Sequence, residues 1–403
     1  MVNTILTPTA VTREALRILH QKLNFVGTIN RQYDSSYAKS GAKIGDSLKV
    51  RLPNQYTVRT GATLAAQDTT ETSVTLQVAT QKGVDVNFTS AERTMDLDDF
   101  SERVLAPAMS VLAANIESDA MSMYQDVANE RSDVGATTTL AMILDLNKGL
   151  TDNLAPYDNR TLNLSTQQMA DMVSATSGLF NDQSRLAKNY REGRMASNSL
   201  GFQNIYENTL LPIHTTGTDD GTGDHLCSGV VSGNDITTGS EGAGTLAVGD
   251  IVTIDTVNSV HPETKADTGV LMQFVVTAAY SATATTLTVS PAPVATGARQ
   301  NISAAIANTD KINKVESDRS TAIGAAADYQ VGMAYHKDAF AFATADLIKP
   351  DGVDFCARQV LDGISMRVIR DYDINADKFP CRIDVLYGYK AIRPELAFRL
   401  GTN

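Results

Sequence analysis

The feature that most constrains the fold is an abrupt change of composition past the middle of the chain. Residues 215–318 are rich in Gly, Thr, Ser, Ala and Val. Strand-like runs occur within this block at 245–257, 270–278 and 285–289, with turns marked by Gly249-Asp250 and by Pro291-Ala292-Pro293. We therefore expect a small all-β module that is inserted between two parts of another domain.

A long helical pattern precedes this block, at about 98–129. Its apolar side chains recur at three- and four-residue steps, as in a helix with one buried side. They are Phe100, Val104, Ala108, Leu112, Ile116, Ala120, Met123 and Val127. Pro107 has no main-chain N–H to donate, so we expect either a kink at this residue or a new helix with Pro107 in its first turn.

The first part of the chain predicts a short helix, a polar arm and several strands. Thr12 is a plausible cap for an amphipathic helix over 13–23. A polar arm follows at 30–43, and a strand at 44–53. The alternating runs 74–78 and 84–88 flank Gln81-Lys82-Gly83, which predicts a hairpin, while 57–72 is polar and extended.

Two capping boxes mark helix starts further along. Thr89 is followed three residues later by Glu92, and Ser165 by Gln168. The second box lies ahead of Met169, Met172, Val173 and Phe180, so we expect a helix there. After the inserted block, 331–340 and 364–372 are expected to return into the parent fold.

The last strand-like run, at 381–395, carries the clearest motif. Arg382, Asp384 and Leu386 alternate with Ile383, Val385 and Tyr387, which is typical of a strand with two different faces, and Pro394 ends the ladder. The ending reads Tyr387-Gly388, two residues, Ala391, one residue, then Arg393-Pro394-Glu395. It resembles the closing segment of the P22-type major coat proteins of tailed phages.

The resemblance implies an α+β fold: an HK97-like capsid fold with an N-arm, extended loop, spine helix, peripheral and axial domains, and an inserted small β-barrel domain. The implied ranges are 1–43 for the N-terminal arm, 44–88 for the extended loop and peripheral-domain strands, 89–135 for the spine helix, 136–214 for the first part of the axial domain, 215–318 for the inserted β-domain, and 319–403 for the return to axial and peripheral-domain strands.

The resemblance also implies a function. Many copies would form the icosahedral shell around phage double-stranded DNA, through a scaffolded procapsid that expands on maturation. The implied partners are other copies, in hexamers and pentamers, with a scaffolding protein and a portal. Alternatives are a cellular HK97-type compartment shell, or a carboxylate- or metal-dependent hydrolase that carries a β-module.

Composition favours a container over a nucleic-acid binder. The net charge of −12 argues against a protein that grips nucleic acid, because phosphate binding needs clustered Lys and Arg. The first ten residues lack the pattern of a secretory signal, and no apolar run is long enough to span a membrane. We expect assembly in the host cytoplasm and final residence in the virion.

Motifs for chemistry are scarce, so we predict no catalytic, cofactor-binding or metal site, no cofactor and no enzyme. Phosphate-binding loops and a Gly-x-Ser-x-Gly elbow are absent from the sequence. The best metal candidate is a loop with His214, Asp219, Asp220, Asp224 and His225, which we interpret as a solvated domain junction. Asp96, Asp98 and Asp99 are interpreted as helix-start carboxylates, and Cys227, Cys356 and Cys381 as buried thiols.

Overall fold

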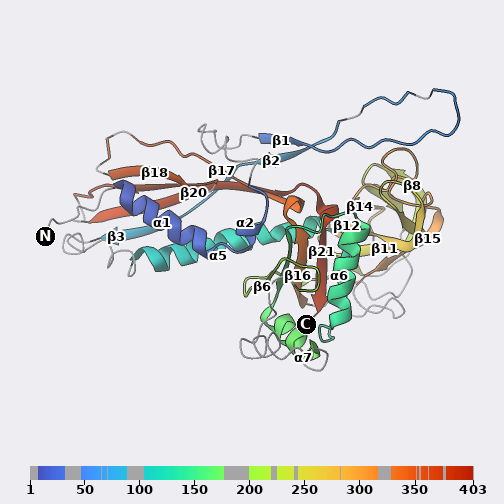
Figure 1. Ribbon diagram of the computed structural model, residues 1–403, viewed down its shortest axis with the longest axis horizontal. Coiled ribbons are helices and arrows are strands. Elements are labelled where there is room, and N and C mark those ends of the chain that lie inside the picture. The colour runs from blue at the N-terminus through green and yellow to red at the C-terminus, as the bar shows by residue number, and fades with distance from the viewer. Residues whose placement is uncertain are drawn as a thin grey trace. The chain divides into compact units, whose positions relative to one another are not determined.

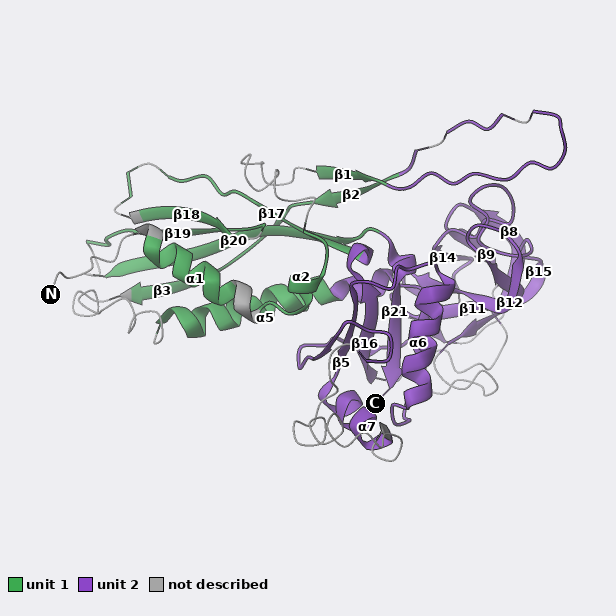
Figure 2. Cartoon of the chain, in the orientation of Figure 1, with its two compact units in different colours: residues 1–51, 73–121, 340–392 green, residues 52–72, 122–339, 393–403 purple. Residues whose placement is uncertain are grey.

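The computed structural model describes residues 8–31, 47–64, 66–69, 71–88, 104–176, 199–218, 225–239, 244–281, 283–315, 328–350, 352–353, 355–361, 363–374 and 378–402. The chain divides into two compact units (Figure 2). Unit 1 comprises 1–51, 73–121 and 340–392, and unit 2 comprises 52–72, 122–339 and 393–403. Both units combine helices with sheets, so the predicted α+β class is confirmed.

Unit 1 contains a sheet of five strands with helices packed against it (Figure 1). The sheet order is β17-β20-β19-β18, and β3 pairs with β20. Helix α1 packs against β18 and β19, and α5 packs against β3. The elements of unit 1 are α1 (Pro8–Lys22), α2 (Phe25–Thr28), β1 (Ser47–Arg51), β2 (Ser73–Gln77), β3 (Thr80–Phe88), α5 (Ala106–Met121), β17 (Phe340–Ala345), β18 (Phe355–Leu361), β19 (Ile364–Arg370) and β20 (Phe379–Ala391).

The predicted hairpin around Gln81-Lys82-Gly83 is wrong. Strand β2 pairs with β1, whereas β3 runs through all three residues and pairs with β20. Gly83 looked like a turn residue, but it lies opposite Asp384 in the ladder, where an added Cβ would clash with the carbonyl oxygen of Ile383. Glycine is used here for close packing within a strand.

Helix α5 is described from Ala106, and Pro107 is its second residue. Residues 104 and 105, directly before it, are π-helical, and 89–103 lie outside the described residues, so the two alternatives at Pro107 stay predictions. The apolar stripe is buried at Leu112, Ile116 and Ala120, while Phe100 and the box at Thr89 and Glu92 lie outside the described residues. In the first helix the prediction erred at the start: α1 begins at Pro8, and Thr12 is buried inside it.

Unit 2 contains a mixed sheet with the order β4-β21-β16-β5-β6, and β7 pairs with β16. The pairs β5/β6 and β4/β21 are parallel. The elements of this part are η4 (Ser122–Asp126), β4 (Glu130–Ser132), α6 (Leu140–Asp152), β5 (Arg160–Leu164), α7 (Thr166–Thr176), β6 (Asn204–Glu207), β7 (Ile213–Thr215), β16 (Asp328–His336), η5 (Lys337–Ala339), η6 (Pro394–Leu396) and β21 (Ala397–Thr402).

The capping box at Ser165 is confirmed by reciprocal hydrogen bonds. The main-chain N–H of Gln168 donates to Oγ of Ser165 at 3.1 Å, and the main-chain N–H of Ser165 donates to Oε1 of Gln168 at 3.0 Å. These bonds satisfy two donors that the first turn of α7 leaves open. Met169 and Met172 are buried as expected, while Phe180 lies outside the described residues.

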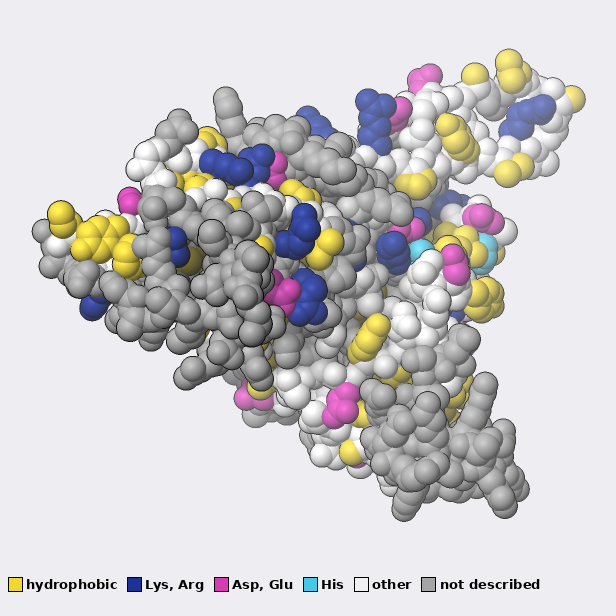
Figure 3. All heavy atoms as spheres, turned by 60° about the vertical axis from the view of Figure 1, so that its left-hand side comes forward, with side chains coloured by type: hydrophobic (Ala, Val, Ile, Leu, Met, Phe, Trp, Pro, Cys, Tyr) yellow, Lys and Arg dark blue, Asp and Glu magenta, His cyan; other side chains and the backbone are white. Residues whose placement is uncertain are grey.

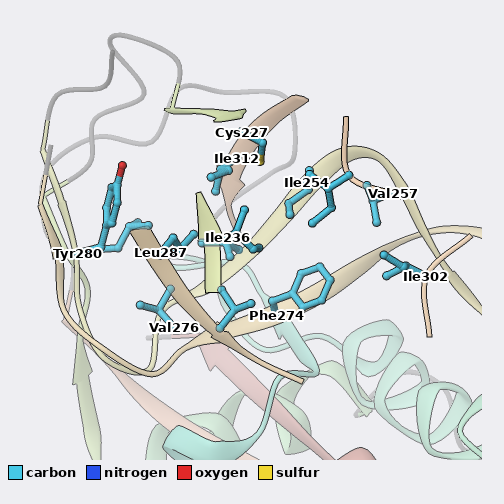
Figure 4. Close-up of a cluster of buried hydrophobic side chains, with 14 residues drawn as sticks. Cys227, Ile236, Ile254, Val257, Phe274, Val276, Tyr280, Leu287, Ile302 and Ile312 are labelled. Carbon is cyan, nitrogen blue, oxygen red and sulfur yellow. The ribbon is translucent and has the colours of Figure 1, made fainter. Parts of the chain in front are cut away.

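The inserted block contains a closed barrel with its own core. The strands follow the order β11-β12-β14-β9-β8-β15, and β15 pairs with β11 to close the barrel. Phe274, Ile254, Leu287 and other side chains fill its interior (Figure 4). The elements of the block are β8 (His225–Ser232), β9 (Asp235–Thr238), β10 (Thr245–Leu246), β11 (Ile251–Val260), β12 (Asp267–Val276), β13 (Tyr280–Ser281), β14 (Thr286–Ser290) and β15 (Asn308–Lys314).

We predict that Ile116 of α5 is a main contributor to the stability of unit 1. Ile116→Ala removes a side chain that is 1% exposed, and the cavity should lower the free energy of unfolding by roughly 2–5 kcal/mol. Val111→Ala, at a position that is 59% exposed on the same helix, should cost no more than about 0.5 kcal/mol. Urea unfolding measures both, and equal losses would show that the buried face is wrongly assigned.

Candidate functional site

The loop between β1 and β2 is extended and irregular in its described part. Residues 52–72 have no helix or strand in their described part. The two sides of the loop are joined by one side chain: the main-chain N–H of Thr57 donates to Oε1 of Gln67 at 2.9 Å, and Nε2 of Gln67 donates to the carbonyl oxygen of Thr57 at 2.5 Å. At the base, the N–H of Leu52 donates to the carbonyl oxygen of Thr72 at 2.9 Å. The loop therefore keeps a ribbon form with few main-chain bonds.

Apolar side chains of this loop face solvent. Tyr56, Val58 and Leu64 are 56%, 95% and 81% exposed. Figure 3 shows hydrophobic side chains spread along the loop at the upper right, with basic side chains among them. Apolar groups gathered on an extended segment gain free energy when another surface covers them. The loop is thus suited to lie on a partner surface.

The barrel is joined to the mixed sheet where the chain leaves and returns. Strand β7, before the barrel, pairs with β16, after it: Thr215 lies opposite Asp328, and Ile213 opposite Gln330. The two ends of the insertion are therefore neighbours in one sheet. This arrangement lets a module be inserted without breaking the parent sheet.

A chain of buried polar groups crosses from the sheet to the barrel. Both ring nitrogens of His214, in β7, have a hydrogen-bond partner. Nδ1 lies 3.1 Å from the hydroxyl of Tyr124, and Nε2 lies 2.9 Å from Oδ1 of Asp250. Oδ2 of Asp250 accepts from the main-chain N–H groups of Gly217 at 3.0 Å and Ala247 at 2.7 Å. Asp250 immediately precedes β11, so this chain ties the barrel to the sheet.

An ion pair extends the same network. Nη2 of Arg399 lies 2.7 Å from Oε2 of Glu130 and donates to the carbonyl oxygen of Gly249 at 2.8 Å. The hydroxyl of Tyr329 donates to Oε1 of Glu130 at 2.9 Å. Both charged side chains are fully buried. We call Tyr124, Glu130, His214, Asp250, Tyr329 and Arg399 the polar joint.

Apolar packing at the polar joint is small. Ala128, Ile251 and Val275 form a cluster of three buried residues, with Val315 packed against it. Next to them, Gln273 of β12 exchanges two hydrogen bonds with the main chain of Glu130, at 2.8 and 2.9 Å. Polar contacts thus make up much of the connection between the barrel and the mixed sheet.

The two histidines of the candidate metal loop, His214 and His225, lie in different environments. His214 belongs to the polar joint, and the buried ring of His225 packs edge-on against Tyr280 at 5.4 Å. Asp219, Asp220 and Asp224 lie outside the described residues, as do Asp96, Asp98 and Asp99. Within the described ranges, no group of three or more His, Cys, Asp or Glu side chains is placed to hold a metal ion.

The thiol prediction is correct for two of three cysteines. Cys227 and Cys381 are buried, and burial raises the pKa of Cys381 to about 11. Cys356 is only partly buried, because β18 is the last strand of its sheet.

No described helix has the length and apolar character needed to cross a bilayer.

Sequence reasoning missed the polar joint, because its members come from distant segments. Glu130 and Arg399 are far apart in the chain and meet only through the parallel pairing of β4 with β21. One local signal was present: Arg399 stands between Phe398 and Leu400 in an apolar run. An isolated charge in such a run indicates a buried and paired group.

A comparison with known protein families finds a match for part of this chain. Residues 230–400 match the family model of the P22 coat protein, gene protein 5. The match begins in β8 and ends in β21, so it covers most of the barrel, part of the polar joint and the motif of β20. No curated protein matches the sequence.

Solved phage structures align along most of the chain at low identity. A chain from Mycobacterium phage Che8 is 13% identical with a TM-score of 0.48, and the alignment covers 94% of this chain and 90% of that one. A capsid chain of cyanophage P-SCSP1u is 11% identical, with a TM-score of 0.45 and coverage of 90% and 85%. A mature capsid chain of bacteriophage PhiM1 is 12% identical, with a TM-score of 0.44 and coverage of 89% and 82%. Because all three TM-scores lie below 0.5, we base function on the family match.

The class of protein follows from this match: residues 230–400 are similar to a bacteriophage coat protein, and both units of the chain have an α+β fold. The predicted resemblance to the P22-type coat proteins is confirmed over residues 230–400. The closed barrel is the inserted β-module that the resemblance implied.

We predict that removing one partner of the ion pair between Arg399 and Glu130 destabilises the protein more than replacing both partners. Arg399→Met leaves Glu130 buried without its cation, so the free energy of unfolding should fall by about 3–5 kcal/mol. Arg399→Met combined with Glu130→Gln should recover part of this loss. Urea unfolding followed by circular dichroism measures the change.

Arg393→Met is the matched control, because the ion pair of Arg393 with Glu395 is exposed. It should cost no more than about 1 kcal/mol. Equal losses for the two arginine variants would contradict the special role of Arg399.

Proposed function

We propose that many copies of this chain assemble into an icosahedral shell that encloses the double-stranded DNA of a tailed phage. The observation that carries the proposal is the match of residues 230–400 to the P22 coat protein family. Hexamers and pentamers of the chain would form the shell in the host cytoplasm. A scaffolding protein and a portal would take part, and the first shell would expand on maturation into the virion.

The loop 52–72 supplies the contact between copies in this proposal. Its apolar side chains are exposed in the single chain, and its ribbon has few main-chain bonds of its own. Laying the loop across a neighbouring copy would bury Val58 and Leu64. At about 25 cal/mol per Å² of apolar surface, each such side chain would contribute on the order of 1–3 kcal/mol to one contact.

The acidic charge is compatible with a container. With a net charge of −12, the chain offers little general attraction for phosphate. A wall that bound packaged DNA tightly would hinder its movement during filling and release. We therefore propose that the shell encloses DNA without sequence-specific binding.

We also propose the implied domain ranges, with 215–318 as a domain that folds on its own. The closed barrel and its separate core support this proposal. An excised fragment of these residues should give a dispersed NMR spectrum of a β-rich domain, since about a hundred residues can bury enough surface to be stable. A disordered fragment would contradict an independent domain.

We predict that exposed apolar side chains of the loop drive assembly. Val58→Ser with Leu64→Ser should shift the protein from large closed or irregular particles toward small species, because the loop loses apolar surface to bury. Analytical sedimentation and negative-stain microscopy, with scaffolding protein present, give the readout.

The matched control keeps the apolar character at the same positions, with Val58→Ile and Leu64→Met, and should assemble like the unmodified chain. Normal particles from the serine variant would rule out this role of the loop. A wild-type protein that stays monomeric under all salt and concentration conditions, with scaffold added, would contradict the shell function itself.

A further inference from the structure

A buried arginine holds the loop between α6 and β5 in one shape. Arg160, the first residue of β5, is fully buried. Its Nε donates to the carbonyl oxygen of Pro156 at 2.8 Å, and its Nη2 donates to that of Ala155 at 2.6 Å. Its Nη1 donates to the side chains of Asn147 and Thr151, both in α6. The guanidinium therefore fixes the course of the chain from the end of α6 to β5.

This support is unfavourable for the single chain in one respect. Among the described residues, the hydrogen-bond acceptors of Arg160 are neutral oxygen atoms, and no carboxylate pairs with it. Burying a charge without an opposite charge costs free energy. The guanidinium also lies over the ring of Tyr157, with Cζ 4.4 Å from the ring centroid. Tyr157 is nevertheless 71% exposed, so the loop presents a positioned aromatic ring to solvent.

Helix α6 ends at a leucine in a conformation that favours glycine. The main-chain N–H of Leu154 donates to the carbonyl oxygen of Thr151 at 3.0 Å, and that of Ala155 donates to the carbonyl oxygen of Leu150 at 2.8 Å. These two bonds form the Schellman motif, in which glycine is the usual residue at the position of Leu154. The φ angle of Leu154 is +60°, where a side chain is strained. Glycine would end this helix with less strain.

The side chains of Leu154 and Tyr157 therefore serve the single chain poorly. They are 45% and 71% exposed. Asp152 and the exposed Asp158 flank them, and Lys148 is paired with Asp152 at 3.0 Å. A loop with this charge does not attract phosphate, which argues against nucleic acid as its partner. An aliphatic and an aromatic side chain held in a fixed position are typical of a contact with another protein surface.

A second apolar patch of the same unit lies in the segment 208–213, which leads from β6 into β7. Leu210 and Ile213 are 37% and 62% exposed. This segment is also held by hydrogen bonds. The main-chain N–H of Asn208 donates to the carbonyl oxygen of Leu164 at 2.9 Å, and Oδ1 of Asn208 accepts from the main-chain N–H of Leu210 at 2.9 Å. Unit 2 thus presents two different apolar patches on ordered segments.

The two patches cannot cover each other within one chain. On strand β16, Arg160 lies opposite His336, whereas Ile213 lies opposite Gln330. These positions are six residues apart along one strand, which is about 20 Å at roughly 3.3 Å per residue. A second copy can bring its own segment onto the loop. In a ring of identical copies, each member presents two different surfaces to its two neighbours, as these patches would.

We propose that the loop 153–158 of one copy docks on the segment 208–213 of the next copy, so that the two apolar patches cover each other. The contact rests on the proposed function, because it requires copies arranged in rings. The same two patches serve every member of a ring, whether it has five or six copies. Because Arg160 already holds the ring of Tyr157, little conformational freedom is lost when the contact forms.

Cysteine crosslinking of assembled particles tests the contact directly. A chain with both Asp158→Cys and Leu210→Cys, treated with a short bis-maleimide, should give a ladder of covalent dimers, trimers and larger species up to closed rings, because every copy carries both halves of the contact. Each single variant should stay at the background of the unmodified chain, which contains Cys227, Cys356 and Cys381. Dimers from Asp158→Cys alone, or normal particles without a ladder from the double variant, overturn the contact and leave the shell function standing.

Leu154→Gly separates the contact from the stability of the single chain. Because glycine relieves the strain at this φ angle, the urea midpoint of the unassembled chain should be no lower than that of wild type. The protein concentration needed for assembly should rise by roughly tenfold or more, because an apolar side chain is lost from the contact. Sedimentation measures this concentration. A lower urea midpoint, or assembly at the wild-type concentration, overturns the role of Leu154.

Tyr157→Ser should weaken assembly as Leu154→Gly does. Tyr157→Phe is the matched control: it keeps a ring over Arg160 and should assemble like wild type. Equal assembly of the serine and phenylalanine variants overturns the contact. A wild-type chain that forms neither rings nor particles under any condition overturns the proposed function and the contact together, which distinguishes that failure from the failure of the contact alone.

Discussion

The pairing of β7 with β16 is the constraint on which the arrangement of unit 2 depends. It places the start and the end of the inserted block side by side in one sheet. Strand β16 also pairs with β5 and with the C-terminal β21. The first strand after the insertion therefore lies at the centre of the mixed sheet. Since the ends of the block meet there, the barrel can close on its own strands and leave the mixed sheet continuous.

The polar joint adds orientation to this connection. Paired strands fix where the chain enters and leaves the barrel. The ion pair of Arg399 with Glu130 and the contacts of His214 with Asp250 and Tyr124 add further connections, and each requires a particular distance and direction. Buried ionic contacts of this kind favour one geometry over others, while their net contribution to stability is modest.

Features that depend on neighbouring residues could be predicted from the sequence, whereas features that depend on contacts between distant segments could not. The box at Ser165 and the runs at 270–278 and 285–289 all depend on neighbouring residues, and the structure confirms them. Strands β5 and β21 were missed because the partners that define them lie far away in sequence. The hairpin at Gly83 was wrong for a related reason: a glycine marks a turn locally, whereas here its small size is required by β20. The same limit hid the buried side chain of Glu117 in α5, which accepts hydrogen bonds from the main-chain N–H groups of Phe25 and Val26, more than ninety positions away.

The closure of the barrel has a consequence for a protein that is proposed to pack against many copies of itself. Sheets with a free lateral strand present unsatisfied N–H and C=O groups, and neighbouring identical chains can extend such sheets without limit. In the ring β11-β12-β14-β9-β8-β15, each strand has a partner on both sides. In the proposed shell, neighbouring barrels can therefore lie close together without pairing through their barrel strands, which leaves contacts between these strands to side chains, whose pattern can be specific.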